Sequence, residues 1–351
     1  MSLSRVDAIA NAVLYEGYML YPYRASAIKN RQRFNFGVVV PETKPRVVFS
    51  SELSSFTTEC LLTLQGSDAE LDAEVRFLQL VDRDILAPTG EAGTTAGGSG
   101  QFAEVESIIV DGELLTAWQE AVERRVASGP LKVCQLLEGQ WQKEFSIAAD
   151  RQSEPIYDRE GTLAARVIRR RCALSGYMSA RCAELAPGLI KVSFKIANTS
   201  EFCSEQKTSL RTSLLSTHTV FRVKSGEFVS MTAPPEYLAG MTGSCKNVGT
   251  WPVLAGEAAD ATDVLLSSPI ILSDYPEIAP ESAGELFDGC EIDEILALRI
   301  MAMTDEEKRE MRSVDDRTRA ILQRTEQLPP EQFMKLHGAM RALTPASKER
   351  A

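Results

Sequence analysis

The segment Leu189-Ile190-Lys191-Val192-Ser193-Phe194-Lys195-Ile196 decides the fold class of this 351-residue chain. Apolar and polar side chains alternate along it, and this period of two is typical of a strand with one buried face. Pro187-Gly188 supplies a turn before the segment, and Tyr177–Leu185 reads as the preceding strand. We therefore expect an antiparallel pair whose core-facing residues include Val192, Phe194 and Ile196.

Further strands separated by turns extend this pattern along the chain. Leu71–Val81 alternates, but the alternation slips at Leu78, which indicates a bulge or the end of the strand. The other predicted strands are Phe34–Val40, Phe56–Leu64, and a hairpin of His218–Val223 with Glu227–Met231. Repeated short strands of this kind favour an antiparallel β-sandwich or barrel-like module over a doubly wound sheet.

Helical periodicity and capping signals predict helices near both ends of the chain and one in between. Apolar residues at helical spacing predict a helix over Arg5–Glu16. Thr116-Ala117-Trp118-Gln119 has the form of a capping box, so a helix with one apolar face should follow it. Two further capping boxes, Asp288–Glu291 and Thr304–Glu307, predict C-terminal helices, the first of them over Glu291–Met303.

These patterns divide the chain into four regions. An N-terminal α+β region over residues 1–130 precedes an antiparallel β region over 131–287, which ends in an acidic loop. A helical region over 288–343, whose last helix follows Pro329-Pro330, should pack on the β core, and 344–351 form a disordered tail. The predicted fold class is α+β, with an antiparallel β-sandwich-like core, an N-terminal helix and a C-terminal helical region.

The composition is that of a globular protein with an acidic surface. Asp and Glu number 49 against 38 Lys and Arg, and the formal net charge of -11 opposes binding to nucleic acid or anionic lipid. No apolar run approaches the ~20 residues that span a bilayer, and the N-terminus lacks the pattern of a secretory signal. We therefore expect a cytoplasmic protein without membrane insertion, whose seven scattered cysteines are reduced.

The acidic loop within Ser267–Glu294 is the first candidate binding segment. Its proline-punctuated part carries Asp274, Tyr275, Glu277 and Glu281. The carboxylates could bind a hard cation, although their spacing fits no EF-hand. They could also form a protein-docking surface, or a solvated connector that supplies negative charge to the start of the next helix. Because prolines stiffen the segment and no paired Cys or His lies nearby, we expect partner recognition and no metal catalysis.

A segment rich in tyrosine and basic residues follows the first helix and is the second candidate. Its residues Tyr21, Tyr23, Arg24, Asn30 and Arg31 include the side-chain types enriched at protein interfaces. The same mixture could bind single-stranded nucleic acid, but the net charge argues against that. The remaining alternative is that the tyrosines cover a sheet edge while the basic residues are simply solvated.

Signals for catalysis and for cofactors are weak. The chain has no GxGxxG, GxxxxGK or GxSxG motif, so nucleotide binding and a nucleophile elbow have no support. Cys203, His218 and Cys245 lie too far apart in sequence for a typical zinc site. We expect His218 to be satisfied by a neighbouring carbonyl, Trp251 to fill the core, and no catalytic residue, metal or cofactor.

Three segments carry a resemblance to a known family. They are LYEGYMLYPYRASAIKNRQRFNFGVVVP (Leu14–Pro41), STHTVFRVKSGEFVSM with NVGTWPVL (Ser216–Met231 and Asn247–Leu254), and the stretch from SSPIILSDYPEIAPES to TDEEKREMR (Ser267–Arg312). Together they resemble an uncharacterised bacterial family whose genes tend to lie in uptake nickel–iron hydrogenase clusters. The resemblance implies an accessory role in hydrogenase assembly or function, and it carries over no catalytic residue.

The favoured hypothesis is a non-enzymatic accessory or assembly protein that binds a protein partner, such as a hydrogenase subunit or maturation factor. The alternative is a divalent-metal-dependent hydrolase that uses carboxylates of the acidic loop over 274–294. The two hypotheses differ in what the surface should show. An enzyme needs a concave pocket where polar groups converge, whereas a docking protein exposes a patch of tyrosine, arginine and apolar groups.

Overall fold

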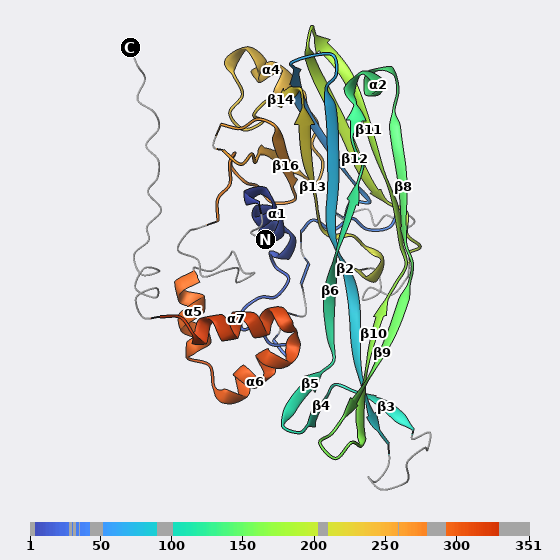
Figure 1. Ribbon diagram of the computed structural model, residues 1–351, viewed down its shortest axis with the longest axis vertical. Coiled ribbons are helices and arrows are strands. Elements are labelled where there is room, and N and C mark those ends of the chain that lie inside the picture. The colour runs from blue at the N-terminus through green and yellow to red at the C-terminus, as the bar shows by residue number, and fades with distance from the viewer. Residues whose placement is uncertain are drawn as a thin grey trace.

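The computed structural model describes residues 4–27, 30, 33–34, 36–42, 52–89, 101–202, 210–258, 260–278 and 293–329. Two sheets pack together over part of their length, and the longer one continues beyond the packed region toward a group of helices (Figure 1). Both sheets combine strands from the predicted 1–130 and 131–287 regions, so the two regions share one β core.

The first sheet is antiparallel and, within the described residues, has five strands in the order β14-β1-β12-β11-β8. The strands are β1 (Ser55–Leu64), β8 (Trp141–Ile147), β11 (Leu174–Ala186), β12 (Leu189–Asn198) and β14 (Gly226–Phe228). A turn at Pro187-Gly188 joins β11 and β12 as an antiparallel hairpin. This confirms the hairpin predicted from the alternation in Leu189–Ile196.

The second sheet is organised around one long strand, β2 (Glu70–Pro88). Its other strands are β3 (Phe102–Val105), β6 (Trp118–Ala127), β7 (Leu131–Lys132), β9 (Asp150–Tyr157), β10 (Leu163–Arg171), β13 (Leu215–Lys224), β15 (Trp251–Leu254) and β16 (Val264–Ser268). β13 and then β10 pair along one side of β2, while β7, β6 and β3 pair along the other. β9 extends the sheet beyond β10, and β16 and β15 extend it beyond β13.

A small hairpin and several helices complete the described fold. The hairpin consists of β4 (Ser107–Val110) and β5 (Glu113–Thr116). The helices are α1 (Arg5–Tyr15), α2 (Val133–Glu138), α4 (Ala239–Thr242), α5 (Asp293–Met301), α6 (Asp305–Val314) and α7 (Asp316–Glu326), with 3-10 turns η2 (Leu210–Thr212) and η3 (Glu236–Leu238). Figure 1 shows α6 and α7 beside β4 and β5 at the end of the molecule opposite α4.

The core between the two sheets confirms the predicted fold class. Val192, Phe194 and Ile196 are buried there together with side chains from β2 and β13. The ring of Phe194 meets the ring of Phe221 edge-on, with centroids 5.1 Å apart, and so links the two sheets directly. The protein is α+β, with an antiparallel sandwich-like core, an N-terminal helix and C-terminal helices.

The slip in alternation at Leu78 marks a change of surroundings and not the end of a strand. β2 continues to Pro88 without a register shift against β6. Residues up to Phe77 contribute to the core between the sheets, whereas Leu78 and Leu80 belong to a second core with the N-terminal segment and the C-terminal helices. The irregularity lies in the opposite strand, where β13 shifts register between Leu215 and His218.

The helix predicted after Thr116 is wrong, because these residues form the strand β6. Ten residues, Trp118 to Ala127, pair with β2 from Arg83 to Glu74. Trp118 and Ala121 are both buried, and their three-residue spacing imitated a helical face. The Thr116 hydroxyl does not cap a helix; it lies 3.0 Å from the Ser313 hydroxyl of α6. Strand pairing in the folded protein thus outweighs a local capping signal.

Two other predicted strand arrangements also need correction. The predicted hairpin across Lys224-Ser225-Gly226 is wrong, because β14 pairs with β1 and the chain there crosses from one sheet to the other. No strand forms over the described part of Phe34–Val40; Val39 makes only isolated bridges, to Leu53 and Leu214. Trp251 is 45% exposed, so the prediction that it fills the core is wrong as well.

The helices agree with their capping signals where the structure describes them. α1 begins after Ser4, whose hydroxyl accepts a hydrogen bond from the Asp7 amide. The Thr304–Glu307 capping box is present in full and starts α6. Asp315 is extended and caps a separate helix, α7. α5 ends at Met301, two residues before the prediction, while its predicted capping box, the last predicted helix and the tail lie outside the described residues.

Gly249 tests how closely the loop before β15 packs against the sandwich core. A Cβ on Gly249 would lie 2.3 Å from the Phe56 ring, while a Cβ on Gly188 would meet nothing within 4 Å; both residues have a positive φ, +76° and +74°. Gly188→Ala should cost about 1 kcal/mol from backbone conformation alone. Gly249→Ala should cost roughly 1–3 kcal/mol more, because the ring must move. Urea unfolding measures both, and equal losses would contradict this packing.

Candidate functional site

The tyrosine-rich segment after α1 forms an interface within the chain. The Tyr18 hydroxyl donates a hydrogen bond of 2.7 Å to the Asp315 carboxylate at the start of α7. The Arg317 guanidinium stacks 4.2 Å from the centre of the Tyr15 ring and also donates to the Tyr15 hydroxyl. Burial and the neighbouring Asp315 charge raise the pKa of Tyr18 well above its usual range. These contacts fix the C-terminal helices to the N-terminal segment.

Arg33 anchors the same segment to β6. Its guanidinium stacks 3.9 Å from the centre of the Trp118 ring and donates to the carbonyls of Tyr18, at 3.0 Å, and Gln119, at 2.6 Å. Burial lowers the pKa of Arg33 to about 10, which still leaves the side chain charged at neutral pH. A buried arginine that stacks on a ring and donates to two carbonyls is one of the stronger ways to hold an irregular segment on a sheet.

The residues predicted to bind a partner in this segment mostly face inward. Tyr23 and Asn30 are buried, and the Asn30 amide bonds the backbone of Leu20 and Arg24. Arg24 pairs with Glu307 at 3.2 Å on α6. Tyr21 is half-buried and lies under the Arg299 guanidinium of α5, 5.3 Å from its ring centre. Arg31 lies outside the described residues.

The described residues of the acidic loop are also engaged within the chain. The Asp274 carboxylate accepts hydrogen bonds from the Thr232 hydroxyl at 2.6 Å and the Leu254 amide at 2.8 Å, and from Ser230. Tyr275 donates its amide to the Leu254 carbonyl at 2.7 Å. Glu277 is exposed and pairs with Arg5 of α1 at 2.9 Å. The last predicted residue, Glu281, lies outside the described residues, while Asp274 and Glu277 are held by separate partners.

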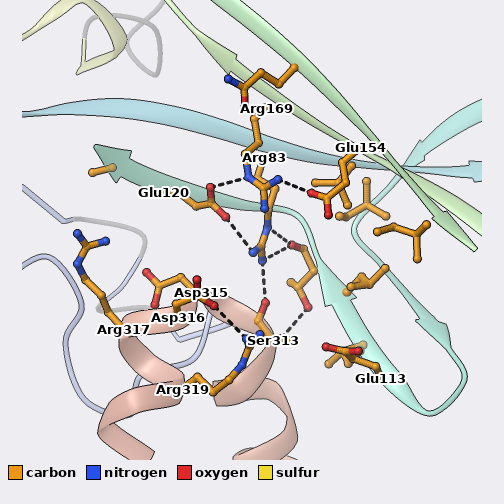
Figure 2. Close-up of a pocket in the computed structure, with 18 of the residues that line it drawn as sticks. Arg83, Glu113, Glu120, Glu154, Arg169, Ser313, Asp315, Asp316, Arg317 and Arg319 are labelled. Carbon is orange, nitrogen blue, oxygen red and sulfur yellow. Dashed lines mark hydrogen bonds and ion pairs between the residues drawn. The ribbon is translucent and has the colours of Figure 1, made fainter. Parts of the chain in front are cut away.

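A pocket of about 660 Å³ lies between the far end of the second sheet, the β4-β5 hairpin and the start of α7 (Figure 2). Its volume is in the range of small-ligand and side-chain binding sites. Strands β2, β5, β6, β9 and β10, the end of α6 and Tyr18 all contribute side chains. Segments far apart in the sequence therefore meet here.

A ladder of alternating charges forms one wall of the pocket. Arg83 and Arg169 are directly opposite each other on β2 and β10, an arrangement that would be repulsive alone. Glu120 accepts from both, with its two oxygens 3.0 Å from Nη1 of Arg83 and 3.0 Å from Nε of Arg169. Glu154 accepts from Arg169 at 2.7 Å. Figure 2 shows these four side chains joined in one network.

The ladder also fastens α6 to the sheet. Arg83 Nη2 donates at 2.7 Å to the carbonyls of Thr116 and Ser313. Burial lowers the pKa of Arg83. Burial alone would also lower the pKa of Arg169, but its hydrogen bonds to Glu154 and Glu120 outweigh this and raise it. Both arginines are thus positioned, charged and occupied by carboxylates or carbonyls.

Other parts of the pocket are apolar or carry less constrained charges. Ile85 and Val167 are buried beside the ladder, and Ile156 is half-buried. Glu113, at the start of β5, is exposed, and its carboxylate has no hydrogen bond or ion pair to any described residue. Asp316 is almost fully exposed and pairs with Arg319 at 2.9 Å. The pocket thus has a wall in which the arginine and glutamate charges are paired, and an apolar floor. At its rim, Glu113 supplies a negative charge that is unpaired among the described residues.

None of these pocket residues was predicted from the sequence. β9 and β10 are rich in charged residues, but these do not alternate regularly with apolar ones, so the sequence carries no clear signal of a charged strand face. The register that places Glu120 between Arg83 and Arg169 depends on strand pairing, which no local pattern specifies. In addition, the incorrect prediction of a helix after Thr116 placed Glu120 in a helix, although it lies in the strand β6.

His218 lies away from this pocket, in β13. It is fully buried, and Nδ1 is 3.0 Å from the Ser216 carbonyl as predicted, while Nε2 is buried without a hydrogen-bond partner among the described residues. Burial lowers the pKa of His218 to about 4, and nearby Arg76 and Arg125 act in the same direction. Five cysteines are described, and none of them is in a disulfide. Burial raises the pKa of Cys182 to about 12. Among the described residues, no group of His, Cys, Asp and Glu side chains is placed to hold a metal ion.

Comparison with known proteins adds no relative. No protein-family model matches the chain, and no curated protein matches it. Within the described residues, none of the helices combines the length and apolar character that a membrane crossing requires.

Substitution of Glu120 tests whether the charge ladder contributes to the stability of the folded protein. Glu120→Gln should lower the free energy of unfolding by about 1–3 kcal/mol, because two partly buried arginines lose their shared counter-charge. Glu113→Gln is the matched control in the same pocket and should change stability by less than about 0.5 kcal/mol. Urea unfolding at low and moderate salt measures both variants. Equal effects of the two substitutions would show that the ladder does not contribute to stability.

His218 predicts a pH dependence of stability. Its folded pKa of about 4 lies below the unfolded value near 6.5, so acidification between these values protonates only the unfolded chain. Stability should therefore be fully present above pH ~6.5 and fall by up to about 1.4 kcal/mol per pH unit below it. His218→Gln should flatten this slope between pH 7 and 5, as measured by urea unfolding. Identical slopes for both proteins would contradict the assignment.

Proposed function

We propose that the protein is a non-enzymatic accessory or assembly protein that binds a protein partner at the end of the molecule where the charged pocket opens. One observation carries this proposal. Ile109 and Tyr157, which are 60% and 59% exposed, lie on the β4-β5 hairpin and on β9, and the hairpin (through β5) and β9 both contribute residues to the pocket lining. Ile109 pairs across the hairpin with Leu114, which lines the pocket. Tyr157 follows the lining residue Ile156 at the end of β9 and, because side chains alternate along a strand, lies on the other face of that strand. Exposed apolar and aromatic groups beside a polar recess are typical of docking surfaces.

The internal pairing of the ladder supports the same proposal. An acid or base in catalysis needs a side chain free to exchange a proton with a substrate. In this wall Glu120 and Glu154 instead bind Arg169, and Glu120 also binds Arg83. Such a network holds a surface rigid and charge-balanced, which lowers the ordering cost of binding a second protein.

The hydrolase alternative has less support from the described residues. Asp274 is held by Thr232 and the Leu254 amide, and Glu277 by Arg5. A partner from the nickel–iron hydrogenase system, either a subunit or a maturation factor, is suggested by the sequence resemblance alone. We place the protein in the cytoplasm as part of the same proposal.

Affinity purification from the native host, grown while hydrogenase is expressed, tests the proposed function. Tagged protein should co-purify with a hydrogenase subunit or maturation factor, identified by mass spectrometry. The double variant Ile109→Ser, Tyr157→Ser should lose most of that recovery, because each residue would supply buried apolar area in the complex.

A matched control removes the same two residue types elsewhere. Tyr237→Ser, Ile271→Ser changes two exposed side chains, one on η3 beside α4 and one after β16, and should leave the recovery unchanged. The proposal fails if no protein is enriched over the tag alone. It also fails if both double variants recover the partner equally well.

A further inference from the structure

The charges that line the pocket leave an excess of one carboxylate. The lining contains four arginines and five acidic residues. Arg83 and Arg169 bind Glu120, Arg317 stacks on Tyr15, and Arg319 binds Asp316. Glu113 is the lining carboxylate without a hydrogen bond or ion pair among the described residues. Figure 2 shows it on the hairpin side of the pocket with no contact drawn to it.

This distribution of charges favours a positively charged ligand over a negatively charged one. At the ladder, an anion would have to compete with Glu120 and Glu154 for Arg83 and Arg169, which are already paired, and breaking such pairs leaves poorly solvated charges. A cation can pair with Glu113 and disturb none of the existing bonds. The formal net charge of -11 acts in the same direction by attracting basic partners to the surface.

The pocket also offers apolar surface for a side-chain stem. Ile156, Leu114 and Leu115 line the pocket and are only half-buried. They therefore supply accessible aliphatic groups above the buried Ile85 and Val167. Lysine and arginine carry three or four methylene groups below the charge and commonly lay these groups on apolar surface while the head reaches a polar one. Among the natural side chains, these two combine such a stem with a positive charge that pairs with a carboxylate.

From this geometry we infer that the pocket receives one basic side chain, lysine or arginine, from the partner protein, and that Glu113 pairs with its charge. The inference rests on the proposed function and adds the chemistry of the partner. The stem of the inserted residue lies against Ile156 and Leu114, while neighbouring partner residues cover Ile109 and reach around the end of β9 to Tyr157. The ladder holds the pocket open and takes no part in the new ion pair.

Fluorescence anisotropy with short peptides tests this inference. The probes are capped heptapeptides with a neutral fluorophore and one central arginine, lysine or citrulline, which keeps the shape of arginine without its charge. The arginine and lysine peptides should bind roughly three- to tenfold more tightly than the citrulline peptide. Glu113→Gln should abolish this difference. Glu144→Gln is the matched control, because Glu144 is exposed on β8 in the other sheet, and should preserve it.

Each other outcome overturns the inference. Equal binding of the arginine and citrulline peptides, or no saturable binding of either, removes the basic-residue site. If Glu113→Gln still binds the arginine and lysine peptides more tightly than the citrulline peptide, charges other than Glu113 cause the preference. If Glu144→Gln abolishes the preference as completely as Glu113→Gln does, the net charge of the protein causes it. If the partner still co-purifies with Glu113→Gln as well as with the unmodified chain, the proposed function stands and only this contact is wrong.

Discussion

The pairing of β2 along its whole length is the constraint on which the rest of the structure depends. Its first half, to Phe77, lies in the core between the sheets, and Leu78 and Leu80 lie in the second core with the C-terminal helices. Further along, Arg83 reaches the carbonyl of Ser313 on α6. One continuous strand thus fixes the sandwich, the helices and the pocket relative to one another, so the rim side chains have defined positions without any dedicated scaffold of their own.

Much of the fold follows from the sequence because it is locally encoded. Alternation predicted the hairpin of β11 and β12, helical spacing predicted α1, and the Thr304 capping box predicted the start of α6. The errors occur where a long-range contact overrides a local signal. Trp118 and Ala121 imitate a helical face but pair with β2. The slip at Leu78 looked like an irregular strand because the sequence does not reveal that a second core covers the sheet there.

From the sequence, only the residue types of the site could be predicted, and not which surfaces those residues bring together. The tyrosine and arginine residues after α1 do form an interface, as their composition suggested, but the partner surface is α5, α6 and α7 of the same chain. Composition reports that side chains such as Tyr18 and Arg24 favour burial at a contact; it does not say whether the contact lies within a chain or between chains. The ladder was invisible for a related reason, since Glu120 joins Arg83 and Arg169 only through the register of three strands.

Hydrogen–deuterium exchange of the purified complex tests most directly whether the pocket end is the docking surface. Binding of the co-purified partner should slow exchange in 107–116 and 152–157, which carry the hairpin and the end of β9, and around 313–319, where α6 meets α7. Exchange around η3 and α4, at 236–242, should not change. Protection confined to 236–242, or to any surface away from the pocket, would contradict the account.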